Sequence, residues 1–215
     1  GFQIIAGIDH WDISLKTFKR NHQNAQISNI DLSQFRIEDI DTLLHGVKPD
    51  VIIGGPPCQG FSISGKRNPN DPRNKLYQAY VTLIEKYHPK AFVMENVPNL
   101  LAMNEGKVKD TIIQEFSNLG YVVEYKVLLA SDYGVPQNRR RVFIVGLRDG
   151  AKFEFPAPVF VNNKVTSSEA ISDLPEVEVS DGNKYLLEPQ SKYQELMRQE
   201  STGIFNHQIT KHSEQ

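Results

Sequence analysis

The chain's only cysteine, Cys58, lies in a loop that could present it for nucleophilic chemistry. The run before it, PDVII at residues 49–53, ends in β-branched apolar residues and predicts a buried strand. Two glycines end that strand, and Pro56 and Pro57 fix the backbone immediately before the sulfur. A thiol at the carboxyl end of a strand is where an α/β fold commonly places its chemistry. The alternative is a small buried cysteine in a turn, because unpaired cysteine is among the residue types most often buried.

Two further segments place charged side chains at the ends of apolar strands. The first, AFVMENVP at residues 91–98, carries Glu95 at its end, where the alternative role is to cap the next helix. The second, at residues 132–146, carries Arg139, Arg140 and Arg141 into an apolar strand. Because side chains alternate along a strand, Arg139 and Arg141 are expected on one face and Arg140 on the other. Two guanidinium groups on one face suit bidentate contacts to a carbonyl or a phosphate, although three adjacent arginines are also typical of a solvated turn.

Taken together, the sequences PPCQ, ENV and QNRRR, in this order, resemble the C5-cytosine methyltransferase family. In such a reaction a thiolate adds to carbon 6 of cytosine, and carbon 5 then accepts a methyl group. The resemblance implies that Cys58 is the nucleophile, which must react as a thiolate. It implies that Glu95 donates a proton near ring nitrogen 3. Arg139 and Arg141 match the two arginines of the family's block and are expected in the active site, with Arg140 outside it or on a phosphate.

The family resemblance also implies S-adenosylmethionine as the cofactor. Residues 2–9, FQIIAGID, predict a strand ending on Asp9, and an acidic residue there suits hydrogen bonding to a ribose diol. The family more often has glutamate at this position. By resemblance, His10 and Trp11 flank the adenosine and Asp31 contacts the adenine amino group, although Asp-Leu-Ser is also a common helix N-cap. The remaining residues expected in the cofactor pocket are Leu32, Pro57 and Leu76.

The substrate that the resemblance implies is double-stranded DNA with the target cytosine flipped out of the helix. A net charge of −2 does not exclude DNA, because phosphate binding depends on a local basic surface. The loop after Cys58 could equally be an ordinary polar surface loop. The residues expected to contact nucleic acid are Gln59, Ser62, Ser64, Lys66, Arg67 and Arg140.

Strand and helix patterns alternate along the chain and predict an α/β fold with a doubly wound, mostly parallel, Rossmann-like sheet. The connection over residues 130–140 is too short for a helical crossover, so the last strand is expected to be antiparallel. Residues 1–150 are expected to form the catalytic and cofactor-binding domain, and 151–215 a linker and the start of a target-recognition region. The expected strands are 2–8, 51–54, 91–94, 121–129 and 141–147, and the expected helices are 12–21, 38–45, 75–87 and 107–118, with a further helix start near Thr166.

Some features of the family are missing. The glycine-rich cofactor motif and the C-terminal recognition region have no match, so we expect an internal piece of a longer enzyme that is inactive alone. Hydrophobic residues make up 39% of the chain, and no membrane span is predicted. The single cysteine predicts no disulfide and suits a reducing compartment, here expected to be the bacterial cytoplasm. No metal site is predicted.

The sequence thus predicts a DNA (cytosine-5-)-methyltransferase of a restriction-modification system, with a cognate endonuclease as functional partner. The alternatives are a tRNA methyltransferase of the same fold and a non-catalytic DNA-binding subunit completed by a partner chain.

Overall fold

The computed structural model describes residues 1–57 and 75–209, which form two compact units. The first unit contains Gly1–Val127 and Arg141–Phe155. The second contains Leu128–Arg140 and Pro156–Gln215. The segment over residues 128–140, which we expected within the first domain, therefore clusters with the second unit.

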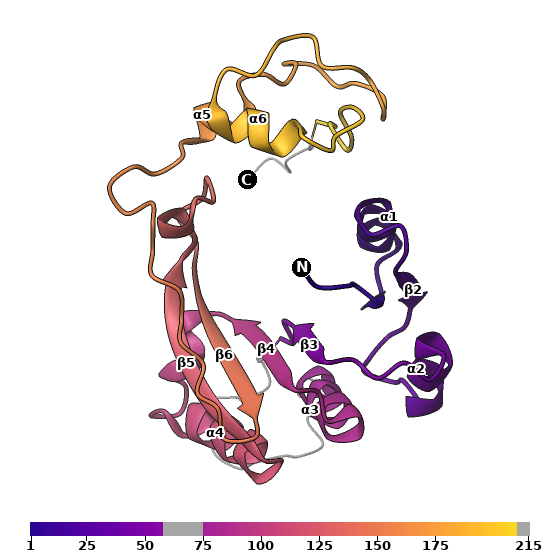
Figure 1. Cartoon of the computed structure of the whole chain (residues 1–215), viewed down its shortest axis with the longest axis vertical. Helices are drawn as coiled ribbons and strands as arrows, with labels where there is room; N and C mark the ends of the chain where they lie inside the picture. The colour runs from indigo at the N-terminus through magenta and orange to yellow at the C-terminus, as the bar shows by residue number, and fades with distance from the viewer. Residues whose placement is uncertain (58–74, 210–215) are drawn as a thin grey trace, which may run out of the picture. The chain divides into compact units, whose positions relative to one another are not determined.

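The larger sheet has the strand order β3-β4-β6-β5 (Figure 1). Its strands are β3 (Val51–Gly54), β4 (Ala91–Asn96), β6 (Arg140–Arg148) and β5 (Tyr121–Leu129). β3 runs parallel to β4, whereas β6 runs antiparallel to β4, in the orientation expected for the last strand. The sheet is therefore mixed, and β3 and β4 bring their carboxyl ends to the same edge.

A second sheet pairs β1 (Ala6–Asp9) in parallel with β2 (Gln26–Asn29). We did not predict β2, because three of the four residues of its sequence QISN are polar and both of its end residues are exposed. In the described part of the chain β1 and β3 belong to separate sheets, where we expected one continuous sheet. The ring of Phe18 packs so closely on Gly7 that a Cβ there would come within 2.4 Å of it, and this contact seats α1 (Asp12–Asn21) against β1.

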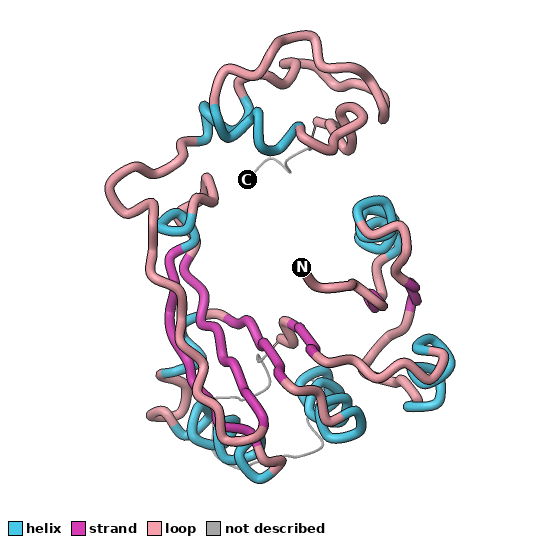
Figure 2. The backbone as a smooth tube through the Cα atoms, viewed as in Figure 1, coloured by secondary structure: helices cyan, strands magenta, loops and turns pink. Residues whose placement is uncertain are grey.

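The helices of the first unit follow the apolar periodicity of the sequence (Figure 2). α1, α3 (Lys75–Tyr87) and α4 (Lys107–Asn118) have the predicted bounds, and α2 (Ile37–Leu44) is shifted by one residue. α3 buries Tyr77, Tyr80 and Ile84, which recur every three or four residues along one side. A 3₁₀ helix, η2 (Pro98–Leu101), follows β4, and another, η3 (Ala130–Tyr133), follows β5.

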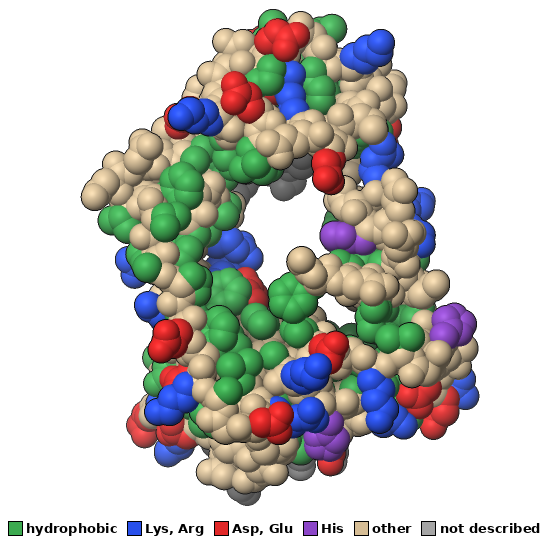
Figure 3. Space-filling view, viewed as in Figure 1, with side chains coloured by type: hydrophobic (Ala, Val, Ile, Leu, Met, Phe, Trp, Pro, Cys, Tyr) green, Lys and Arg blue, Asp and Glu red, His purple; other side chains and the backbone are tan. Residues whose placement is uncertain are grey.

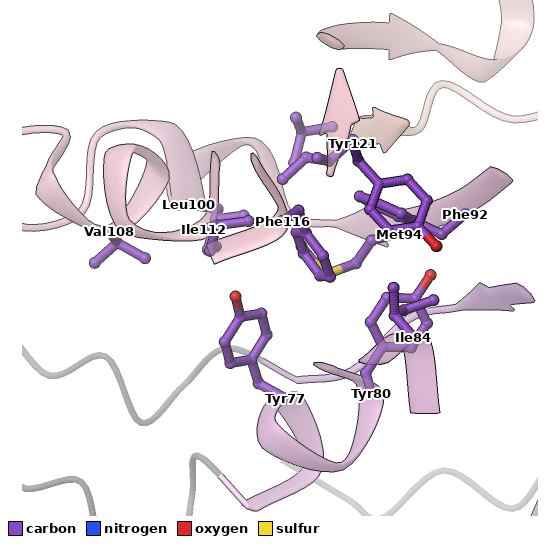
Figure 4. Packing of buried hydrophobic residues seen from close by; sticks show 12 residues of the cluster. Tyr77, Tyr80, Ile84, Phe92, Met94, Leu100, Val108, Ile112, Phe116 and Tyr121 are labelled. Carbon is purple, nitrogen blue, oxygen red and sulfur yellow. The ribbon is translucent and has the colours of Figure 1, made fainter. Parts of the chain in front are cut away.

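The core lies between the larger sheet and the helices α3 and α4 (Figure 4). Phe92 from β4 and Phe116 from α4 stack with their ring centroids 4.2 Å apart, and both are fully buried. The hydroxyl of Tyr80 donates to the carbonyl of Val93 at 2.9 Å and lies 3.3 Å from that of Ile52, which ties α3 to both β3 and β4. Burial alternates along β4, so Phe92, Met94 and Asn96 face the core and Glu95 faces the opposite side.

The second unit is built around α5 (Ser167–Ile171) and α6 (Lys192–Arg198). α5 starts where we predicted: Thr166 accepts from the backbone N–H of Glu169, and the Glu169 carboxylate accepts from the N–H of Thr166. We did not predict α6. Its Arg198 lies 3.8 Å from the ring centroid of Tyr185 and pairs with the buried carboxylate of Asp173. Within residues 1–57 and 75–209, every helix is too short or too polar to span a lipid bilayer.

Candidate active site

An ion pair between Glu95 and Arg141 marks the carboxyl end of β4. Arg141 Nε lies 2.9 Å from Glu95 Oε1, and the two side chains are 23% and 34% exposed. The strand register places Glu95 opposite Phe143, two residues from Arg141 on the same face of β6. The 3₁₀ helix that follows has Val97 at its N-cap with no side-chain capping bond, so Glu95 does not cap it. The Glu95 carboxylate instead forms an ion pair with the Arg141 guanidinium.

The three arginines are placed differently from one another. β6 begins at Arg140, so Arg139 precedes the strand and the predicted alternation does not extend to it. The backbone carbonyl of Arg139 accepts a hydrogen bond from the N–H of Ala130 at 2.9 Å. The backbone N–H of Arg139 donates to the carbonyl of Gln137, also at 2.9 Å. Arg139 and Arg140 are exposed and cluster with the second unit, while Arg141 belongs to the first. Arg141 forms the ion pair with Glu95.

The exit of β3 lies directly against Glu95. A Cβ added to Gly55 would come within 3.4 Å of Glu95 Oε2 and 3.7 Å of the Glu95 carbonyl oxygen. One residue earlier, a Cβ on Gly54 would come within 2.7 Å of the ring of Tyr80. Gly54 is therefore required for the close approach of the Tyr80 ring, whereas a Cβ at Gly55 would make an ordinary van der Waals contact with the carboxylate. At Gly55 the backbone that leads to Cys58 thus lies next to Glu95.

Asn96 is a site residue that our sequence reasoning missed. It is 7% exposed, its Nδ2 donates to the carbonyl of Pro56 at 2.8 Å, and its Oδ1 accepts from the N–H of Val97 at 3.0 Å. Alternation from the apolar Phe92 and Met94 could have indicated it, since it predicts a buried amide on the core face. A buried amide must find hydrogen-bond partners, and here it finds one in the β3 exit.

Several predicted site residues fall outside the described part of the chain. They are the expected nucleophile, Cys58, and five of the residues expected to contact nucleic acid: Gln59, Ser62, Ser64, Lys66 and Arg67.

Two predicted cofactor ligands lie at one edge of the smaller sheet. β1 and β2 are parallel, with Asp9 paired to Asn29. Asp9, the last residue of β1, and Asp31, two residues after β2, therefore lie toward the same edge of this sheet. The N–H of Trp11 donates to Asp9 Oδ1 at 3.0 Å, and His10 Nδ1 lies 3.5 Å from the same oxygen. Trp11 is 59% exposed.

Asp31 forms a local turn rather than a helix cap. Its Oδ1 accepts from the N–H of Ser33 at 2.8 Å, and the next helix begins at Ile37 with Arg36 as its N-cap. Hydrogen bonds from the side chain and then the backbone of Ser33 hold the pKa of Asp31 below its usual range. Asp31 is therefore an ionised acceptor at neutral pH, as a contact to an amino group requires.

These donors and acceptors fit an adenosine. The carboxylate of Asp9 suits a ribose diol, and the exposed indole of Trp11 offers a flat apolar surface. Among the other predicted pocket residues, Leu32 and Leu76 are half-buried and Pro57 is exposed.

The charged side chains of the described surface are mixed. On the face shown in Figure 3, lysines and arginines alternate with aspartates and glutamates. Within residues 1–57 and 75–209, no three His, Cys, Asp or Glu side chains are grouped so that they could hold a metal ion.

Comparison with known proteins gives a consistent picture. A model of the C-5 cytosine-specific DNA methylase family matches residues 1–215. The type II methyltransferase M.DdeI of Desulfomicrobium norvegicum is 40% identical over all of this chain and 54% of its own length. M.AgeI of Thalassovita gelatinovora is 39% identical over 96% of this chain and 55% of its own length. The chain thus spans about half the length of these relatives.

Solved structures agree on the fold. The crystal structure of a DNA modification methyltransferase encoded within an E. coli prophage superposes with a TM-score of 0.65 at 28% identity, covering 86% of this chain and 51% of that one. The S. pombe Dnmt2 methyltransferase, at 20% identity over 83% of this chain and 50% of its own, has a TM-score of 0.54 and supports the fold alone. Because the family model matches residues 1–215 and M.DdeI is 40% identical over all of this chain, the chain belongs to the C-5 cytosine-specific DNA methylase family.

Proposed function

We propose that the complete protein is a DNA (cytosine-5-)-methyltransferase that uses S-adenosylmethionine and Cys58 as its nucleophile. The observation that carries this proposal is the Glu95–Arg141 pair, which lies against the backbone of Gly55, three residues before Cys58. A thiol and a carboxyl group are the two groups that addition to a cytosine ring needs.

Each residue has one task in this chemistry. The Cys58 thiolate forms the bond to carbon 6 of cytosine, and electron density moves through the ring toward nitrogen 3. Glu95 is proposed to supply a proton there, and Arg141, whose Nε lies 2.9 Å from Glu95 Oε1, would keep the carboxyl group in one orientation. Carbon 5 would take the methyl group, which leaves the cofactor as its neutral thioether. Transfer of the carbon 5 proton to water would then re-form the ring double bond and expel the Cys58 thiolate, while nitrogen 3 gives up the proton it received. Arg139 is proposed to contact the base or a phosphate.

The cofactor supplies an electrophilic methyl group when it is bound. Its adenosine would lie at the carboxyl ends of β1 and β2, with the Asp9 carboxylate on the ribose and Asp31 on the adenine amino group. His10 and Trp11 would flank the adenosine, and Leu32, Pro57 and Leu76 would complete the pocket.

The proposed substrate is duplex DNA. The target cytosine must leave the stack to reach Cys58, at a cost of about a few kcal/mol. Gln59, Ser62, Ser64, Lys66, Arg67 and Arg140 are proposed to hold DNA. Residues 151–215 would lead toward a target-recognition region, and the enzyme would act in the bacterial cytoplasm to protect DNA from a cognate restriction endonuclease.

The test is transfer of labelled methyl groups by the full-length protein to unmethylated DNA and, in parallel, to tRNA. Label on DNA cytosine is expected, and it should vanish in Cys58→Ala and fall about 10²-fold or more in Glu95→Gln. Glu105→Gln is the matched control, because Glu105 is a carboxylate with an 87% exposed side chain, and its activity should equal that of the parent.

The other outcomes each contradict the proposal. Label on tRNA alone would assign an RNA substrate. No label on either nucleic acid would favour a non-catalytic binding subunit, and full activity of Cys58→Ala would remove the nucleophile from the mechanism.

A further inference from the structure

The carbonyl of Pro56 accepts a hydrogen bond from a side chain, at a place where it would ordinarily accept one from the backbone of a neighbouring strand. The parallel pairing of β3 and β4 ends at Gly54 and Met94. Continuing that register would set Gly55 opposite Glu95 and Pro56 opposite Asn96. Pro56 and Pro57 have no N–H, so neither can donate to a ladder beyond this point. The β3 exit therefore needs another attachment to β4.

The Asn96 side chain supplies that attachment. Its Nδ2 donates to Pro56 O at 2.8 Å, while its Oδ1 is fixed by the Val97 N–H at 3.0 Å. Asn96 is 7% exposed, so the bond is shielded from competing water. Asn96 directly follows Glu95, and its side-chain amide bonds the backbone two residues before Cys58.

We infer that Asn96 is a positioning residue that sets the backbone leading to Cys58 at a fixed distance from Glu95. This inference rests on the proposed function. Asn96 does not touch the reacting atoms; it acts through Pro56 on one side and through the β4 end on the other. Proximity of two catalytic groups is sensitive to small displacements, and a shift of about 1 Å can lower a rate about 10²-fold.

The test measures formation of the covalent protein–DNA adduct by the full-length protein. The probe is long duplex DNA in which 5-fluorocytosine replaces cytosine, because fluorine cannot leave as the proton does and the adduct persists. Such DNA contains many sequences, so the recognition site need not be known. The variants are Asn96→Asp, which keeps an acceptor for the Val97 N–H and loses the donor to Pro56, and Asn96→Ser, whose side chain is too short to reach Pro56.

Tyr121→Phe is the matched control. The Tyr121 hydroxyl also donates to a proline carbonyl, that of Pro89, at 2.7 Å, and the residue is 3% exposed. Pro89 precedes β4, so this bond lies at the end of the strand opposite Asn96. Each of the three variants deletes one buried side-chain bond to a proline carbonyl, but only the two Asn96 variants lose the bond to Pro56, two residues before Cys58.

We expect adduct formation to slow about tenfold or more in both Asn96 variants and to keep the parent rate in Tyr121→Phe. The dissociation constant for S-adenosylmethionine should not change in any of them. Equal adduct rates in the Asn96 variants and Tyr121→Phe would overturn the inference while leaving the proposed function intact. A parent protein that forms no adduct would overturn the proposed function, and the inference with it.

Discussion

The ion pair between Glu95 and Arg141 can be measured by replacing each residue alone and both together. Glu95→Gln removes the negative charge with little change of shape, and Arg141→Met removes the guanidinium but keeps an apolar stem. The free energy of unfolding of the parent and the three variants then gives the coupling between the two side chains.

The structure sets the size of that coupling. Two unit charges 2.9 Å apart attract by about 6 kcal/mol at an effective dielectric constant of about 20. The side chains are 23% and 34% exposed, so water screens the pair and desolvation offsets much of the attraction. We expect a net coupling of about 1–2 kcal/mol at pH 7 and low salt, with a smaller value in 1 M salt.

Asp50 and Lys90 provide a matched control. Their side chains are paired at 2.8 Å but are 71% and 72% exposed, and the pair lies at the amino ends of the same two strands, β3 and β4. The cycle of Asp50→Asn and Lys90→Met should show no coupling above the error of the measurement. Urea denaturation of all variants, followed by circular dichroism, provides the assay. If the Glu95–Arg141 cycle gives the same coupling as this control, the pair does not form in solution, and the argument that Arg141 orients Glu95 fails.

Three further predictions concern packing, pH and capping. Gly146→Ala should lower the free energy of unfolding by about 1–3 kcal/mol, because its Cβ would come within 2.0 Å of the Phe92 ring; an unchanged urea midpoint would contradict this packing. The Tyr87 hydroxyl lies 2.9 Å from the Asp41 carboxylate and holds the pKa of that carboxyl below its usual range. The contribution of this bond to the free energy of unfolding is therefore present above the ordinary carboxyl pKa and is lost as pH falls through the lowered value. Unfolding midpoints of Tyr87→Phe and the parent should therefore differ at pH 7 and converge as the pH falls below the lowered pKa of Asp41, and a difference that widens in acid would refute this sign. Thr166→Ala should cost the second unit about 1 kcal/mol, because it removes half of a capping box, and protease digestion should then cut this unit faster than the parent's.

Local sequence determined most of the regular structure of the first unit. α1, α3, α4 and β5 have the predicted bounds, and in α3 and α4 the buried residues recur at the spacing of a helix. We did not predict β2 or α6, because their sequences, QISN and KYQELMR, contain few buried apolar residues. Both elements depend on neighbouring segments for stability. For α6 the buried residue is Gln194, a polar side chain that no apolar pattern would indicate.

The order of the PPCQ, ENV and QNRRR sequences was enough to indicate the family, because each residue type there has a chemical task. Sequence could also say that Glu95 and an arginine lie at strand ends. It could not say which arginine meets the carboxylate, since that depends on the register of β6 against β4, in which Glu95 lies opposite Phe143. Nor could it show the Asn96–Pro56 bond, which joins residues 40 positions apart. Hydrophobic periodicity is a local property of the chain, whereas the register of two strands and the partner of a buried amide are settled only when distant segments pack.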